Sequence, residues 1–141
     1  MHTVETKWVD GLAFSTTIGD HSINMDAKPE VGGRNLGASP KRMLLSALTG
    51  CTGMDVVSLF KKMRQDVEDF SIDASAELTE EHPIHYKSIH LKYKVSGTNL
   101  DENKVRKAIS LSMERYCGIS YMLSKATNLD FSVEIEELAT A

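Results

Sequence analysis

The chain has 141 residues, which suits one domain, and 41% of them are hydrophobic, an ordinary fraction for a soluble globular protein. Its 16 basic and 20 acidic residues give a net charge of −4 and form no basic stripe, so we expect no nucleic-acid partner. The charged N-terminus MHTVETKWVD is unlike a signal peptide, and the strictly apolar runs are far shorter than the roughly 20 residues of a membrane helix. We therefore expect a cytoplasmic protein without a membrane partner.

The first 38 residues read as a β-meander followed by a loop. TVETKWV and LAFSTTI alternate in part and are joined by Asp10-Gly11, a strong hairpin signal, and HSINMD follows as a third short strand. The glycine-rich residues 27–39 resemble a phosphate loop only in their glycines, because they lack the G-K-[ST] motif. We expect no cofactor.

A long helix is predicted from Pro40 to about residue 65. Ser39 is a suitable cap, and Pro40 fits the first helical position. The segment MLLSALTGCTGMDVVSLFKKM is apolar on most of its circumference, and a helix that is apolar all round is buried all round. Sheets, other helices or a second subunit must therefore cover it.

The remaining segments complete an α+β pattern. Alternating residues predict strands over 69–80 and 85–97, joined as a hairpin through EEHPI. DENKVRKAISLSMERY has helical spacing, Cys117-Gly118 interrupts it, ISYMLSKAT resumes as a short helix, and LDFSVEIEEL is a last strand. The order βββ-α-ββ-αα-β predicts antiparallel sheets around a central helix.

The two cysteines, Cys51 and Cys117, form no disulfide framework and no zinc pattern, so buried thiols are the default interpretation. Cys117 is predicted to begin the second short helix, where free amides lower a thiol pKa; the alternative is that it fills a small space at a helix corner. Gly50 and Gly53 flank Cys51 and together give up about 2 kcal/mol of helix propensity. Close approach of another backbone, room for a ligand, or both would explain them.

Two segments give the chain a family resemblance. SPKRMLLSALTGCTGMDVVSLFKKMRQ, with its mid-helix cysteine, and SMERYCGISYMLSKA, with a late second cysteine, resemble the OsmC/Ohr family of osmotically inducible protein C and organic hydroperoxide resistance proteins. The likeness includes the opening KWVDGLAF and is closest to the less-characterised OsmC-like branch. It implies one OsmC-like domain over 1–141, divided into 1–38 and 39–141, and an intertwined homodimer whose strands wrap each central helix.

The resemblance also implies a thiol peroxidase. Cys51 would attack the O–O bond of an organic hydroperoxide and become a sulfenic acid, and Cys117 would resolve it as a disulfide that a dithiol such as dihydrolipoamide reopens. Apolar side chains would line the site and favour organic peroxides over hydrogen peroxide: Met43, Leu44, Leu48, Met54 and Met122.

One motif departs from the family pattern. Active members pair an Arg with a Glu in the first turn of the central helix, and here Lys41 and Arg42 stand there without a carboxylate. Arg34 is our first candidate for the cation that stabilises the Cys51 thiolate, and Arg42 is the second. The departure motivates an alternative function, in which a non-catalytic dimer binds a small metabolite in the Cys51 pocket.

Three histidines, His82, His85 and His90, suggest a metal site at first sight. His82 and His85 flank a predicted turn, and His90 lies on the polar side of a strand. Because no Cys or acidic residue stands at a diagnostic spacing from them, we expect no metal.

Overall fold

The computed structural model describes residues 1–139. By the contacts within it, the chain forms two compact units, Met1–Leu45 and a second that begins at Ser46.

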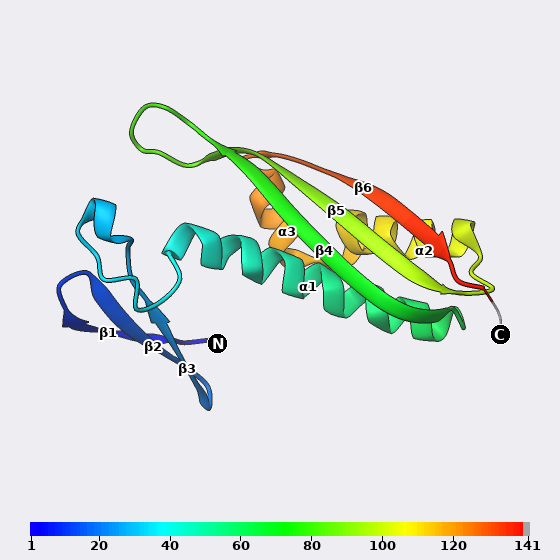
Figure 1. Cartoon of the computed structure of the whole chain (residues 1–141), viewed down its shortest axis with the longest axis horizontal. Helices are drawn as coiled ribbons and strands as arrows, with labels where there is room; N and C mark the ends of the chain where they lie inside the picture. The colour runs from blue at the N-terminus through cyan, green and yellow to red at the C-terminus, as the bar shows by residue number, and fades with distance from the viewer. Residues whose placement is uncertain (140–141) are drawn as a thin grey trace. The chain divides into compact units, whose positions relative to one another are not determined.

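The first unit is the predicted meander. Strands β1 (Glu5–Asp10), β2 (Ala13–Ile18) and β3 (His21–Met25) form an antiparallel sheet in the order β1-β2-β3 (Figure 1). Gly11 has φ +52°, which the tight β1–β2 turn requires and glycine adopts without strain. A short 3₁₀-helix, η1 (Pro29–Val31), lies in the loop that follows.

Asp26 organises this loop. Its carboxylate is buried and accepts N–H groups from Ala27 at 2.7 Å and from Arg34 and Leu36 at 3.2 Å each. These bonds, that from Ala27 foremost, lower the pKa of Asp26. The glycine-rich loop is thus folded around one carboxylate.

The second unit holds a three-stranded sheet in the order β4-β5-β6. Strand β4 (Asp66–Leu78) pairs antiparallel with β5 (Tyr86–Thr98), as predicted, and β6 (Asn128–Glu137) pairs with β5 in the parallel direction. The α+β class is confirmed, but the expectation of purely antiparallel sheets is wrong for this last strand. The helical segment between β5 and β6 returns the chain to the end where β5 begins, so β6 runs in the same direction.

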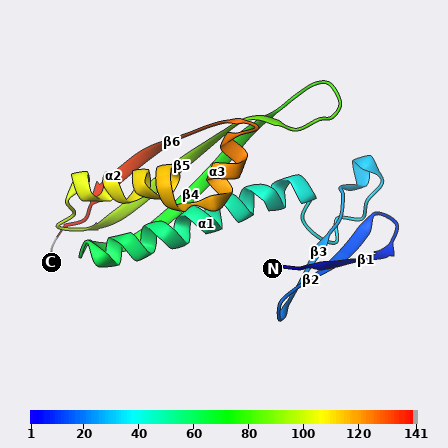
Figure 2. The same cartoon turned by 180° about the vertical axis from the view of Figure 1, so that it is seen from behind.

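All helices of this unit cover one face of the sheet. Helix α1 (Pro40–Lys62) begins at the predicted proline, and α2 (Glu102–Leu111) is capped by Asp101, whose carboxylate accepts the Lys104 N–H at 3.3 Å. Figures 1 and 2 show α1, α2 and α3 (Gly118–Ser124) on the same side of the strands. The other face carries cross-strand ion pairs such as Lys94–Asp73, 2.7 Å apart.

The core lies between α1 and this sheet. Leu48, Thr52, Val56 and Phe60, spaced four residues apart, form the buried stripe of α1. The Phe60 ring meets Phe70 of β4 edge-on at 5.4 Å between centroids. Other buried residues come from β5 and α2: Ile89, Leu91, Tyr93, Val95, Val105, Ala108 and Ile109.

The rest of α1 is open within one chain. Met54 is 78% exposed and Val57 53%, although the sequence predicts burial on every side. By length and composition alone α1 could cross a membrane, with a mean hydropathy of 1.5 over 18 residues, a property that core helices of soluble proteins share.

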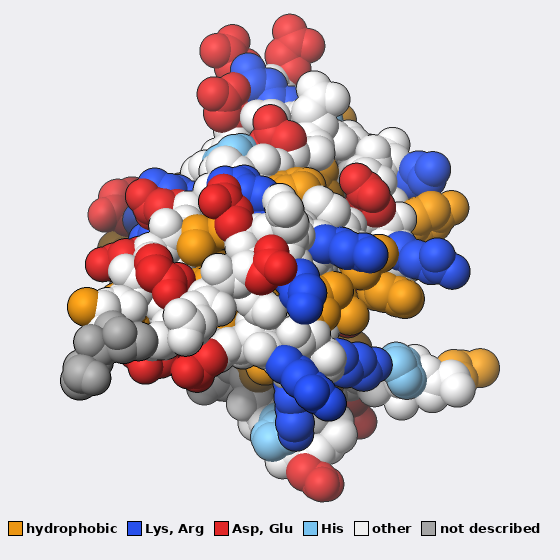
Figure 3. All heavy atoms as spheres, turned by 90° about the vertical axis from the view of Figure 1, so that its right-hand side faces the viewer, with side chains coloured by type: hydrophobic (Ala, Val, Ile, Leu, Met, Phe, Trp, Pro, Cys, Tyr) orange, Lys and Arg blue, Asp and Glu red, His pale blue; other side chains and the backbone are white. Residues whose placement is uncertain are grey.

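Charged side chains of both signs are interspersed over the face drawn in Figure 3.

Candidate functional site

Cys51 and Cys117 come together from distant parts of the chain. Cys51 lies on α1 beside the buried stripe and is half-buried, whereas Cys117 is 3% exposed and precedes the first residue of α3. The Cys117 sulfur accepts the Ser120 N–H at 3.3 Å, so it caps the helix, as the sequence predicts. Both thiols are free.

A π-helical turn positions Cys117 near Cys51. Residues Ser112–Tyr116 (η2) follow α2 directly, and the Cys117 N–H donates to the Ser112 carbonyl at 2.8 Å. Single π turns inside helices often mark functional positions, because the extra residue redirects the side chains that follow. Here the turn ends the first helix and places Cys117 at the start of the next.

Asp55 is the third member of the site, and it is not among the site residues that the sequence predicts. One carboxylate oxygen of Asp55 and the sulfurs of Cys51 and Cys117 all lie within 4.8 Å of one another. The available signal was helical spacing: Asp55 follows Cys51 by four residues and so shares its face of α1.

A chain of hydrogen-bonded hydroxyl groups fixes the Asp55 carboxylate. Ser112 Oγ donates to Asp55 Oδ2 at 3.0 Å, and Thr52 Oγ1 lies 2.7 Å from both Ser112 Oγ and the Tyr93 hydroxyl. Since each hydroxyl has one proton, donation to the carboxylate fixes the direction of the chain: Tyr93 donates to Thr52, and Thr52 to Ser112. All three side chains are buried, so the carboxylate is held by a fully connected polar network.

The surroundings of Cys51 disfavour its thiolate. Burial raises the pKa of Cys51, and the Cys117 thiol and the Asp55 carboxylate raise it further, while the Ile119 N–H acts in the opposite direction. Within residues 1–139, none of the groups that shift this pKa is a lysine or arginine.

Tyr93 gives the hydroxyl chain a measurable pH dependence. Burial raises the pKa of Tyr93 to about 12, against about 10 in an unfolded chain. Because the unfolded tyrosine loses its proton first, stability is retained below pH 10 and falls between about pH 10 and 12, by on the order of 2 kcal/mol. Urea unfolding across this range should show a steeper loss for the wild type than for Tyr93→Phe. Parallel pH curves for the two proteins would contradict this assignment.

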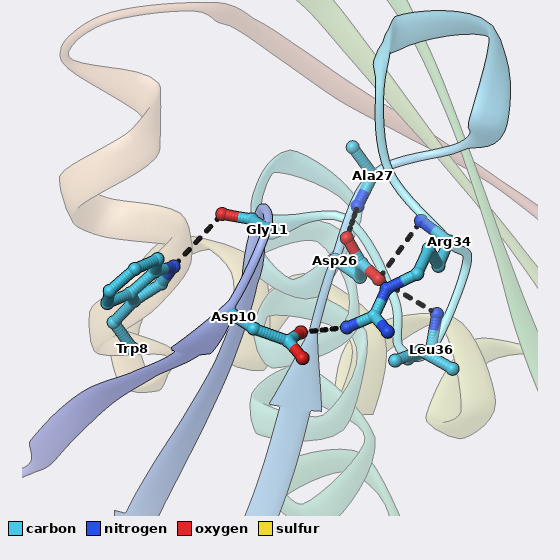
Figure 4. Close-up of polar contacts among 7 residues, drawn as sticks. All are labelled: Trp8, Asp10, Gly11, Asp26, Ala27, Arg34 and Leu36. Carbon is cyan, nitrogen blue, oxygen red and sulfur yellow. Dashed lines mark hydrogen bonds and ion pairs between the residues drawn. The ribbon is translucent and has the colours of Figure 1, made fainter.

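The candidate cations lie as follows. The Arg34 guanidinium forms an ion pair with Asp10 in the first unit, beside the Asp26 loop and near the bond that Trp8 Nε1 donates to the Gly11 carbonyl (Figure 4). Arg42 is exposed in the first turn of α1, and no ion pair within the described residues involves it. The activating role of either arginine stays a prediction.

The predicted apolar wall residues differ in exposure. Leu48 is fully buried in the core, whereas Met54 and Met122 are 78% and 63% exposed. Met43 is half-buried and Leu44 exposed in the first unit. Among residues 1–139 outside the adjoining turns of α1, a Cβ at Gly50 would meet no atom within 4 Å, and one at Gly53 would meet only the tip of Ile72 at 3.4 Å. Within this described part, no other backbone approaches either glycine.

His90 lies on the face of the β4-β5-β6 sheet opposite the helices. On the open face of the sheet, His90 contacts Asp130 at 2.6 Å and Ser132 at 2.9 Å. Among residues 1–139, the cluster of three or more potential metal ligands is Cys51, Asp55 and Cys117, and it contains no histidine.

The family model described as OsmC-like protein matches residues 32–132, and the chain belongs to this family. It is 38% identical to Protein YhfA of Escherichia coli K12 over 130 residues, which cover 92% of this chain and 94% of that one.

Solved structures agree with this assignment. A hypothetical protein from Aquifex aeolicus superposes with a TM-score of 0.87 at 29% identity, covering 99% of this chain and 98% of its own. An organic hydroperoxide resistance protein OsmC from Legionella pneumophila superposes with a TM-score of 0.69 over 95% of this chain and 96% of its own; at 16% identity it shows a shared fold.

Proposed function

We propose that this protein is a thiol-dependent peroxidase that reduces organic hydroperoxides through Cys51 and Cys117. The observation that carries the proposal is the approach of the two sulfurs to within 4.8 Å. A disulfide needs a separation of about 2.05 Å, so a modest movement of the half-buried Cys51 side chain would join them. The family and the described relatives support a redox or peroxide-related role.

The proposed reaction balances as follows. The Cys51 thiolate attacks one peroxide oxygen, the O–O bond breaks, and the alkoxide leaves as an alcohol after taking a proton. Cys51 is then a sulfenic acid, and the Cys117 sulfur displaces its oxygen as water to form the disulfide. An external dithiol such as dihydrolipoamide returns two electrons and restores both thiols.

We further propose that the active form is a cytoplasmic homodimer of this single OsmC-like domain. The support is the face of α1 that stays open in one chain, with Met54 and Val57 more than half exposed on a helix whose sequence is apolar all round. A second copy would cover this face, and the open space at Gly50 leaves room for a close neighbour.

One observation favours the alternative of a non-catalytic dimer that binds a small metabolite. Burial, Cys117 and Asp55 all raise the pKa of Cys51, which is the opposite of what a peroxidatic cysteine needs. The peroxidase proposal therefore requires a cation near Cys51, and Arg34 and Arg42 remain the candidates.

Counting thiols separates the two functions. Reduced protein treated with an organic hydroperoxide and a metal chelator should lose two thiols per chain. One molecule of alcohol should form from the hydroperoxide for every two thiols lost. Denaturing gels without reductant should show single chains, because the disulfide forms within one chain. If both thiols stay titratable under excess hydroperoxide, the protein is not a peroxidase of this kind and the binding function is favoured.

A further inference from the structure

We infer that the reduced site is also a metal site, in which Cys51, Cys117 and Asp55 hold one soft divalent cation such as Zn²⁺. The donor set is the first reason. Zn²⁺ is bound by thiolate sulfur and carboxylate oxygen, and sites with three protein ligands leave a fourth position for water or another ligand. Two sulfurs and one carboxylate oxygen converge here within 4.8 Å of one another.

The distances between the three donor atoms fit a site that contracts slightly around a bound ion. Ligand atoms around tetrahedral Zn²⁺ are separated by about 3.5–3.8 Å, from bond lengths of about 2.3 Å to sulfur and 2.0–2.2 Å to oxygen. The three donors must therefore move inward by about 1 Å at most, given their 4.8 Å limit. Cys51 is half-buried and not locked in the core, so its side chain has freedom to make this movement.

The groups behind the three donors are the second reason. Ligating carboxylates are usually held by further hydrogen bonds that fix their orientation. Asp55 Oδ2 accepts from Ser112, and the Thr52–Tyr93 pair continues the chain. A carboxylate has about four acceptor positions, so one hydrogen bond leaves it able to bind an ion. The Cys117 sulfur accepts the Ser120 N–H, a contact that stabilises thiolate charge.

The peroxidase proposal does not use this carboxylate. An anion beside a nucleophilic thiol opposes formation of the thiolate, whereas the same carboxylate completes a cation site. Sulfur ligands make the site selective, because thiolates prefer Zn²⁺ and similar soft ions to Mg²⁺ or Ca²⁺. Cys51 and Asp55 lie on α1, whereas Cys117 caps α3 much later in the chain. Because of this separation, the spacing of the three residues in the sequence forms no recognisable metal-binding motif.

One consequence rests on the proposed function. If a hydroperoxide oxidises the two metal-bound thiolates, two electrons pass to the O–O bond, and the products are a disulfide, an alcohol, water and the free metal ion after uptake of two protons. The disulfide has lost both sulfur ligands, so oxidation releases the metal. The metal-bound state and the disulfide state then exclude one another at the same two cysteines.

Metal binding is tested on reduced, chelator-treated full-length protein without any peroxide. Titration with Cd²⁺ should give thiolate-to-metal ultraviolet absorption that saturates at one ion per chain, Zn²⁺ should compete, and Mg²⁺ should not. Cys51→Ser and Cys117→Ser should each lose most of this absorption. Asp55→Asn and Ser112→Ala should weaken binding by about 10- to 100-fold.

Two exposed residues provide matched controls. Glu68→Gln removes a carboxylate and Ser75→Ala a hydroxyl, both from β4, and both should bind as the wild type does. Because a cysteine variant can fail to fold, a second readout uses unmodified protein: Zn²⁺ should protect both thiols from alkylation. Absent absorption, absent protection, or unchanged affinity in Asp55→Asn would each overturn the three-ligand site. Since no peroxide is present in this test, its result does not depend on peroxidase activity. The metal site and the proposed peroxidase function can therefore fail separately.

Discussion

Cys51→Ser should reduce hydroperoxide consumption to the rate of buffer without protein. A serine hydroxyl is almost fully protonated at neutral pH and is a poor nucleophile towards oxygen, so the first step of the proposed reaction cannot occur. The substitution changes one atom of a half-buried side chain on α1, and the buried stripe of the helix stays intact. The fold should therefore survive.

The measurement is alcohol formation from an organic hydroperoxide with a dithiol in excess. Ser75→Ala, an exposed change on β4, should keep wild-type turnover. Full activity in Cys51→Ser would show that the nucleophile is another group, and Cys117 would be the next to examine.

Cys117→Ser should stop the reaction one step later. Cys51 would still open the peroxide, but no sulfur would displace the oxygen from its sulfenic acid. Serine is a good helix cap and can accept the Ser120 N–H that the Cys117 sulfur accepts now, so α3 should remain in place.

Trapping with dimedone and mass spectrometry should then find one adduct per chain at Cys51, with a single thiol lost. Wild-type protein under the same conditions should give little adduct, because the disulfide forms first. A Cys51 that stays reduced would contradict its role as the nucleophile, and equal dimedone labelling of the wild type would contradict the resolving role of Cys117.

Local signals in the sequence predicted much of the fold. Asp10-Gly11 marked the first hairpin, Pro40 the start of α1, and the Cys117-Gly118 break the start of α3. Each of these is a short-range effect of backbone conformation or capping, which a few neighbouring residues determine.

The site depends on contacts that local signals do not contain. Ser112 and Thr52 are 60 positions apart, and Asp55 gains its importance only when η2 brings Ser112 and Cys117 to α1. The parallel pairing of β6 likewise follows from the path of the helices between the strands. A helical-spacing search from Cys51 for carboxylates would have found Asp55 as a neighbour, though without its partners.

The peroxidase proposal requires a positive charge that lowers the pKa of Cys51. Within one chain, burial and the neighbouring Cys117 and Asp55 raise the pKa of Cys51, and the groups that act on it include no lysine or arginine from residues 1–139. A positive charge near Cys51 would reverse this balance, whether from the predicted Arg34 or Arg42 or from a metal ion. The two sources differ in outcome, since an arginine activates the thiolate for peroxide and a metal ion occupies it.

The most direct test of the central claim is to map the disulfide after exposure to an organic hydroperoxide. Reduced, chelator-treated protein is oxidised briefly, free thiols are alkylated, and peptides are identified by mass spectrometry without reduction. The account predicts a Cys51–Cys117 link within one chain in nearly every molecule, reopened by dihydrolipoamide. Recovery of both cysteines in alkylated form after excess hydroperoxide would contradict it.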